Sequence, residues 1–297
     1  MNATINEFLK YLKFERNYSD RTVETYGIAL KEYEDYVASE TGSFDPLAPS
    51  LNLARGWMVR MGKQKLAVAT IKRNICALRS FCKYLRRKGK LDSNPLSLMP
   101  TPKVPKPLPH WVREDQMDSL IDDTDFGSDF VGIRDHLLID MLYSTGMRRS
   151  EAAGLQDRDV DFPARTLRVT GKGNKQRLIP FGQELCNLLQ QYIEVRNKTV
   201  GGRTLMLLTD EDGEGLSPQK ITALARKYLE PVPNLERKGA HVFRHSFATN
   251  MLSEGADLMA VKELLGHASL DSTEVYTHLT PQELLQNYRK AHPRSKE

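Results

Sequence analysis

The sequence has few cysteines and no long apolar run, and both absences exclude whole classes of protein. Its three cysteines, Cys76, Cys82 and Cys186, show no CxxC spacing, so we interpret them as reduced thiols in the core. No apolar stretch approaches the roughly 18 residues that a transmembrane helix needs. Charges interrupt the apolar residues of the N-terminal MNATINEFLKYLKFERN, which argues against a signal peptide. Together these absences favour a cytoplasmic protein.

Charge is unevenly distributed along the chain. The net charge is +5, yet residues 1–107 hold 19 Lys and Arg against 10 Asp and Glu. That first third therefore carries +9, and the remainder, with 24 basic against 28 acidic residues, carries −4. Such asymmetry indicates a polyanionic partner for the first third, although a solvated basic surface would show the same pattern.

A proline-rich stretch divides the chain. Six prolines lie between positions 95 and 109, and proline disfavours helix both at its own position and at the residue before it. We therefore predict a domain at 1–100, an extended linker at 101–109 and a second domain at 110–297.

The first domain reads as all helix, with helices at about 4–16, 20–39, 51–61 and 67–88 and Ser19 as the N-cap of the second. The last helix is the clearest, because apolar residues recur at alternating spacings of four and three. This stripe consists of Ile71, Ile75, Leu78, Cys82 and Leu85.

The same helix has a basic flank beside its apolar stripe. One position after most of the stripe residues come Lys72, Arg79, Lys83 and Arg86, about 100° further around the helix. We predict that this flank contacts DNA phosphates. A surface helix with solvated lysines is the alternative.

The second domain reads as mixed. Helices are expected at about 113–122, 130–144, 183–197, 218–229, 242–253, 257–265 and 281–290. The segment TLRVTGKGNKQRLIPF predicts a β-hairpin at about 166–181, with a partner strand near 159–162. The predicted fold is therefore mainly α with a small β-sheet: an all-helical N-terminal domain and an α-rich α/β second domain.

Six residues of the second domain could together cleave a phosphodiester through a covalent phosphotyrosine. Forked guanidiniums suit the charge that develops on the phosphate oxygens, a Lys or His can move protons, and a tyrosine can attack. The six are Arg148, Lys172, His241, Arg244, His267 and Tyr276.

Their local settings differ. Gly146 ends a predicted helix and Ser150 can cap the next, so Arg148 lies at a helix junction. Lys172 lies in the predicted hairpin turn, whose GKGNK lacks the phosphate-loop pattern. His241 and Arg244 are three residues apart and share a helix face.

A zinc site is the competing reading of the histidines. His241, His245 and His267 offer three nitrogen ligands, but no HExxH pattern is present and an Arg within the motif would repel a cation. We therefore expect no metal. No cofactor is expected either, because a phosphotyrosyl ester conserves the energy of the phosphodiester.

Four segments carry a resemblance to a known family. They are MLYSTGMRRSEAAGL, TGKGNKQR, HVFRHSFATNML and LLGHASLDSTEVYTHL, in that order. The chain resembles the tyrosine recombinase (phage integrase) family over nearly its whole length, with the first domain similar to the core-binding domain. Its length, and the lack of an additional N-terminal arm-binding domain, most resemble the Xer group. Met147, Arg149 and Phe243 depart from the family pattern at positions without a catalytic role.

The resemblance implies a role for each residue. Arg148 and Arg244 would clamp the scissile phosphate, and Lys172 would protonate the leaving 5′-oxygen. His241 would act as acid and base, His267 would hold a phosphate oxygen, and Tyr276 would attack to give a 3′-phosphotyrosyl link. His245 is interpreted as structural.

The resemblance also implies an assembly. A C-terminal helix at 281–290 would insert into a neighbouring protomer of a DNA-bound tetramer, homomeric or shared with a second recombinase. Docking on its own domain is the alternative. A membrane-associated activator is compatible with these expectations, although the chain itself has no predicted span.

We therefore predict a site-specific recombinase that acts on double-stranded DNA through a Holliday junction, with chromosome-dimer resolution as its role. Integration of a mobile element is the nearest alternative. A type IB topoisomerase-like enzyme and a non-catalytic DNA-binding protein are alternatives of other classes.

Overall fold

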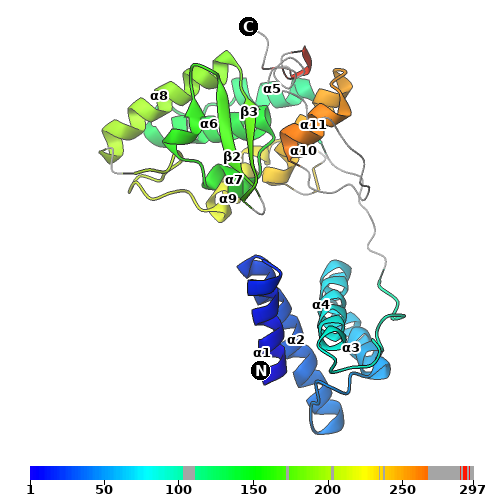
Figure 1. Cartoon of the computed structure of the whole chain (residues 1–297). Helices are drawn as coiled ribbons and strands as arrows, with labels where there is room; N and C mark the ends of the chain where they lie inside the picture. The colour runs from blue at the N-terminus through cyan, green and yellow to red at the C-terminus, as the bar shows by residue number, and fades with distance from the viewer. Residues whose placement is uncertain are drawn as a thin grey trace. The chain divides into compact units, whose positions relative to one another are not determined.

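The computed structural model describes residues 1–102, 111–171, 174–201, 204–233, 235–236, 238–266, 288, 290–292 and 294. The chain forms two compact units, Met1–Pro107 and Leu108–Glu297, and each has its own hydrophobic core (Figure 1). Both units are mainly helical and one small sheet lies in the second, so the predicted fold class is confirmed. Among the described helices, none has the length and apolar character needed to cross a membrane.

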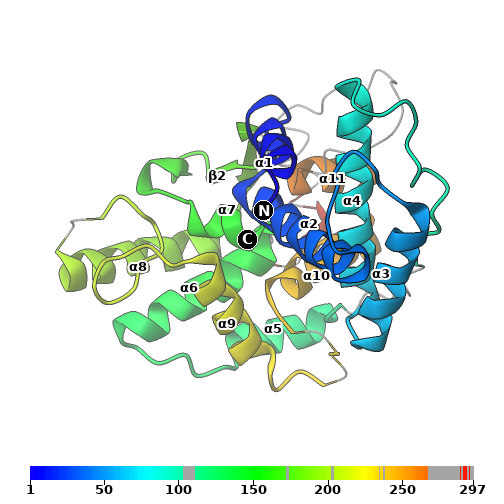
Figure 2. The ribbon, with the colours of Figure 1, turned by 90° about the horizontal axis from the view of Figure 1, so that it is seen from below.

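Every secondary-structure element described in the first unit is a helix. The unit contains α1 (Ala3–Lys10), the π-helical turn η1 (Tyr11–Glu15), α2 (Asp20–Thr41), α3 (Leu51–Lys63) and α4 (Val68–Arg87), which Figures 1 and 2 show in blue to cyan. Ser19 accepts a hydrogen bond from the Thr22 N–H, which confirms it as the N-cap of α2. The predicted stripe on α4 is buried throughout and packs against α2 and α3.

The second unit contains the remaining elements. They are α5 (Glu114–Asp122), α6 (Phe130–Thr145), α7 (Arg149–Ala153), the 3-10 turn η2 (Asp157–Asp159), β1 (Val160–Asp161), β2 (Thr166–Thr170), β3 (Gln176–Pro180), α8 (Gln183–Val200), α9 (Pro218–Leu229), α10 (Ala240–Ser253) and α11 (Leu258–Leu265). The helices predicted within the described residues are confirmed, with their ends shifted by three residues or fewer. The helix predicted at 281–290 lies largely outside the described residues.

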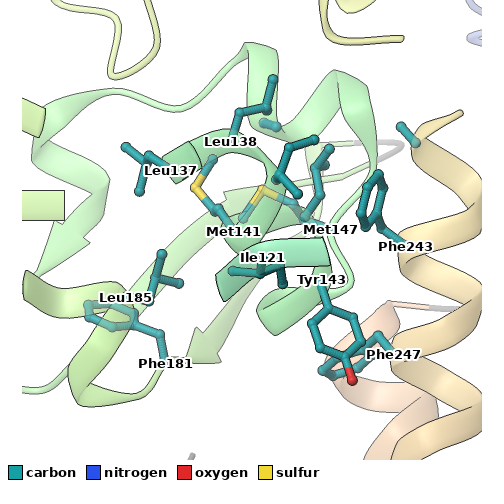
Figure 3. Close-up of a cluster of buried hydrophobic side chains, with 14 of the residues drawn as sticks. Ile121, Leu137, Leu138, Met141, Tyr143, Met147, Phe181, Leu185, Phe243 and Phe247 are labelled. Carbon is teal, nitrogen blue, oxygen red and sulfur yellow. The ribbon is translucent and has the colours of Figure 1, made fainter. Parts of the chain in front are cut away.

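Helix α6 is the centre of the second unit. Fourteen of its 16 residues are buried, as expected for a helix that is covered on every side. The helices α5, α8, α9 and α10 all pack against it. Figure 3 shows Phe243 and Phe247 of α10 reaching toward Met147 and Tyr143, so α10 is fixed against the end of α6.

The sheet is a three-stranded antiparallel meander in the order β1-β2-β3. Thr166 pairs with Pro180 and Thr170 pairs with Gln176, so the register runs along the whole hairpin. The predicted hairpin and its partner strand are confirmed. The register also brings the last residues of β2 opposite the first residues of β3.

Gly146 makes the sharp turn between α6 and α7. Its φ is 58°, and a Cβ there would lie 2.6 Å from Phe247 Cδ1 and 2.9 Å from Leu265 Cδ2. An alanine would therefore combine left-handed strain with overpacking. We expect Gly146→Ala to lower the free energy of unfolding by about 2–4 kcal/mol in urea titrations.

Gly201 provides the matched control for that substitution. It also ends a helix, α8, in the left-handed region with φ 71°, but a Cβ there meets no atom of the described residues within 4 Å. Gly201→Ala should cost only about 1 kcal/mol. Equal losses from the two variants would contradict a packing role for Gly146.

Candidate active site

Arg148 lies at the junction that Gly146 creates. The residue is the N-cap of α7, which begins at Arg149. The prediction that Ser150 caps this helix is therefore wrong, because the cap is made from inside the helix: Glu151 Oε2 accepts the Arg148 backbone N–H at 2.7 Å. The Arg148 side chain is 34% exposed, so its guanidinium can reach solvent or a bound phosphate.

Glu151 is the buried carboxylate at the centre of the site. Its side chain is only 2% exposed. Oε1 accepts from Arg148 Nη1 at 2.8 Å and from Arg177 Nη1 at 3.0 Å, and Oε2 also accepts from Arg177 Nη2 at 2.9 Å. Burial alone would raise its pKa, but the hydrogen bonds from Arg177 and Arg148 outweigh burial and lower the pKa to about 2.

Arg177 enters the site from β3. Besides its two bonds to Glu151, its Nε donates to the Leu264 carbonyl at 2.6 Å. The side chain is 12% exposed, and a Cβ on Gly266 would lie 3.0 Å from its Nη1. Arg177 thus ties β3 both to α7 and to the end of α11.

Arg244 enters from α10 and is almost fully covered. Its Nη1 donates to the Gly146 carbonyl at 2.7 Å and its Nη2 to the Leu265 carbonyl at 2.6 Å. Burial, with the positive charge of Arg148 next, lowers its pKa to about 10. Arg244 therefore stays protonated at neutral pH, and it joins the ends of α6 and α11.

The three arginines meet at the last turn of α11. Arg177 binds the carbonyl of Leu264, Arg244 that of Leu265, and Arg148 those of Leu265 and Gly266 at 3.4 and 3.3 Å. The last carbonyls of a helix lack intrahelical partners and carry its negative end. Three guanidiniums, one carboxylate and this helix end form a compact site with excess positive charge.

His241 stands one turn before Arg244 at the start of α10 and is exposed at the surface. Partial desolvation, followed by the positive charges of Arg149, Arg244 and Arg148, lowers its pKa below the usual value. The imidazole is therefore predominantly neutral near pH 7, which is the form that can accept a proton.

The other three predicted catalytic residues, Lys172, His267 and Tyr276, lie outside the described residues. The described residues directly before Lys172 and His267 border the site. Gly171, directly before Lys172, donates its N–H to the Lys175 carbonyl at 2.8 Å, and a Cβ on it would lie 3.4 Å from Glu151 Oε1. Gly266, directly before His267, accepts from Arg148.

Glu151 should be a major source of stability. Removing one partner of a buried ion pair typically costs about 3–5 kcal/mol, so Glu151→Gln should lower the free energy of unfolding by that amount. The carboxylate also predicts a pH dependence in the parent protein. Because its pKa is depressed in the folded state, its contribution is complete above pH 4.5 and is lost as pH falls toward about 2.

Urea titrations between pH 7 and pH 3 measure both effects. Glu194→Gln is the control, because Glu194 is 67% exposed in its pair with Lys198 and an exposed ion pair contributes little to stability. A Glu151→Gln variant as stable as this control would show that Glu151 contributes no net stability.

Only part of the predicted DNA-binding flank of α4 is exposed for contact with DNA. Lys72, Lys83 and Arg86 are exposed. Arg79 is half-buried, and it donates to the Leu96 carbonyl at 3.2 Å and to Thr101 Oγ1 at 2.6 Å. Arg79 therefore anchors the segment that follows α4 to that helix.

Sequence reasoning missed two members of the site, Glu151 and Arg177. Both lie within the motifs that drew attention to Arg148 and Lys172. An acidic residue three positions after an arginine, at the start of a helix, was the available signal for Glu151. Nothing comparable marks Arg177, because a strand arginine is ordinarily solvated.

Comparison with known proteins identifies the class of this site. Residues 110–283 match the model of the phage integrase family, and residues 5–89 match that of the phage integrase N-terminal SAM-like domain. The chain therefore belongs to the phage integrase family. It is a DNA breaking and rejoining enzyme of the tyrosine recombinase type.

Relatives along the full length place it more narrowly. It is 40% identical to the tyrosine recombinase XerC of Pelotomaculum thermopropionicum over 100% of both chains. It is 34% identical to the tyrosine recombinase XerC of Anoxybacillus flavithermus over 99% of both chains. These relatives identify the activity as Xer-type site-specific recombination.

Solved structures agree in fold. The XerH site-specific recombinase bound to its difH substrate in a pre-cleavage complex is 25% identical, with a TM-score of 0.69 over 95% of this chain and 82% of that one. The XerH post-cleavage complex on a palindromic difH substrate is 26% identical, with a TM-score of 0.71 over 96% and 84%.

Proposed function

We propose that the arginine site binds the scissile phosphate and that Tyr276 attacks it. Arg148 and Arg244 donate to the non-bridging oxygens, where negative charge grows in the transition state. His241 accepts or returns a proton nearby, and His267 holds a phosphate oxygen. Lys172 delivers a proton to the leaving group.

The proposed reaction is a transesterification. The Tyr276 oxygen forms a bond to phosphorus while the bond to the 5′-oxygen breaks, and the phenolic proton passes to the base as Lys172 protonates the 5′-oxygen. The 3′-phosphotyrosyl ester is then attacked by a 5′-hydroxyl of the partner strand. Two such exchanges form and resolve a Holliday junction without an external energy source.

One observation carries the proposal: Arg148 and Arg244 come from positions 96 residues apart and meet at the carbonyl of Leu265, two residues before His267. Arg244 is buried but joined to carbonyls that define a rigid frame, so its charge is held in place before DNA arrives. Preorganised donors of this kind require little rearrangement at the moment of reaction.

We further propose that the exposed basic flank of α4, Lys72, Lys83 and Arg86, contacts DNA phosphates. Arg79 would support that surface through its bonds to Leu96 and Thr101. We propose resolution of chromosome dimers in the cytoplasm as the role, in keeping with the full-length XerC relatives.

A tetramer on DNA is proposed from the C-terminal residues. In the single chain Tyr288 and His292 are 1% and 0% exposed in the core of the second unit. Arg294 pairs with Asp122, Asp140 and Glu184 at 2.9, 3.3 and 3.0 Å. We propose that during recombination the same acidic residues and the same part of the core bind Tyr288, His292 and Arg294 of a neighbouring protomer.

A plasmid carrying two directly repeated candidate sites tests the proposed function. Recombination should split it into two circles, whereas a plasmid without sites should stay supercoiled. Relaxation of both plasmids would favour a topoisomerase, and gel shifts without any product would favour a binding protein.

Two variants test the tetramer in the same assay. Deletion of 281–297 and the milder Arg294→Glu should both abolish recombination and higher-order complexes while single-site binding persists. Full recombination with normal assembly by both variants would rule out the tail exchange.

A further inference from the structure

Arg177 differs from Arg148 in where its donors point. Three of its N–H groups are directed at protein acceptors: Leu264 O and both oxygens of Glu151. Its side chain is 12% exposed, against 34% for Arg148. Arg177 directs its forked edge to the Glu151 carboxylate, whereas the more exposed Arg148 keeps an edge that a phosphate can approach.

The pairing of Arg177 with Glu151 determines what is left for Arg148. Each oxygen of Glu151 already accepts one N–H from Arg177, and the Arg148 backbone N–H takes a further position on Oε2. The Arg148 guanidinium therefore bonds Glu151 through Nη1 alone. Among the described residues, its Nη2 makes one contact, at 3.3 Å with the Gly266 carbonyl.

Without Arg177, Oε1 and Oε2 of Glu151 could together accept a pair of hydrogen bonds from a different guanidinium. A guanidinium and a carboxylate prefer two parallel hydrogen bonds. Arg148 would therefore rotate toward Glu151 and donate to it through both Nη1 and Nη2. The donors that a phosphate needs would then be neutralised. Lysine could replace the charge of Arg177 but not its two parallel N–H donors.

We propose that Arg177 is a positioning residue of the active site: by occupying the paired face of Glu151, it keeps the Arg148 guanidinium available to the scissile phosphate. It does not itself contact DNA in this role. The inference rests on the proposed function, because it assigns Arg148 to the phosphate.

Single-turnover cleavage of a nicked suicide substrate at saturating protein tests the inference, with DNA affinity and thermal stability measured in parallel. Arg177→Lys should slow cleavage about 10²-fold, the loss expected when a reacting group is misplaced, with little change in the dissociation constant. Arg177→Ala should behave similarly if it folds, and the lysine variant carries the test if it does not.

Arg196 provides a matched control. It is 1% exposed, pairs with both oxygens of Asp157 and donates to the carbonyls of Met206 and Leu207, and none of these described partners belongs to the site. Arg196→Lys should lower thermal stability and leave the cleavage rate unchanged. Equal rate losses in both lysine variants would reduce Arg177 to a general structural role and overturn the inference.

A double-mutant cycle separates positioning from direct binding. If Arg177 acts through Arg148, then Arg177→Lys should cost almost nothing in an Arg148→Ala background. Losses that multiply to within about twofold, as independent sites do, would overturn the inference while leaving the proposed function intact. Absence of cleavage by the parent protein on every site would instead overturn the proposed function, and this inference with it.

Discussion

Replacing Tyr276 with phenylalanine should abolish the covalent protein–DNA adduct while DNA binding is retained. The change removes only the phenolic oxygen, which forms the bond to phosphorus in the proposed reaction. No other group of the site can replace it, because guanidiniums are not nucleophiles at neutral pH and the neutral His241 is assigned to proton transfer. A suicide substrate, nicked beside a candidate recombination site, accumulates the adduct on a denaturing gel.

Tyr33→Phe is the control for that experiment. Tyr33 is 3% exposed in the core of the first unit, so its variant should form adduct at the parent rate. An adduct that persists in Tyr276→Phe would assign the nucleophile to a different residue. Loss of adduct in both variants would indicate a general loss of fold.

Replacing Arg244 with alanine should slow cleavage by about 10²–10³-fold, the usual loss for one preorganised donor. Two effects combine. The phosphate loses a buried cation, and the Gly146 and Leu265 carbonyls lose the donor that joins them, so the junction of α6 with α11 loosens as well.

Arg244→Lys separates these two effects. Lysine restores the charge but cannot reach two carbonyls and a phosphate with one ammonium, so recovery should be small. The single-turnover cleavage rate is the measurement, with DNA affinity as the check on fold. A loss below about tenfold in Arg244→Ala would contradict a role for Arg244 in the transition state.

Local patterns in the sequence were sufficient for most of the fold. The alternating hairpin, the proline-rich linker and the stripe on α4 all express short-range rules, and the first and last are found in the structure. The N-cap of α7 was assigned wrongly because serine is the commoner capping residue. The carboxylate of Glu151, inside the helix, accepts the Arg148 backbone N–H instead, and its other partner, Arg177, lies elsewhere in the chain.

The site was only partly predictable for the same reason. Glu151 and Arg177 are 26 residues apart, and Arg148 lies 117 residues from the Leu265 carbonyl. Only the tertiary fold brings β3 and the last turn of α11 to α7. A motif can nominate Arg148 as a phosphate ligand, but it does not show which neighbour holds the guanidinium in place.

Arg79 shows the same limit of pattern reasoning on α4. Helical periodicity correctly places it on the flank beside the apolar stripe. Its bonds to Leu96 and Thr101 depend on where the chain returns after the helix, which periodicity does not encode. Lys72 and Lys83 are exposed, as predicted.

Identifying the amino acid and the DNA end in the covalent adduct tests the account most directly. The adduct formed on the suicide substrate is digested with protease, and the peptide that remains on the DNA is sequenced by mass spectrometry. The expected residue is Tyr276, one of 11 tyrosines in the chain, joined to a 3′-phosphate with a free 5′-hydroxyl on the other strand end. A different residue, or a link to a 5′-phosphate, would contradict the proposed reaction.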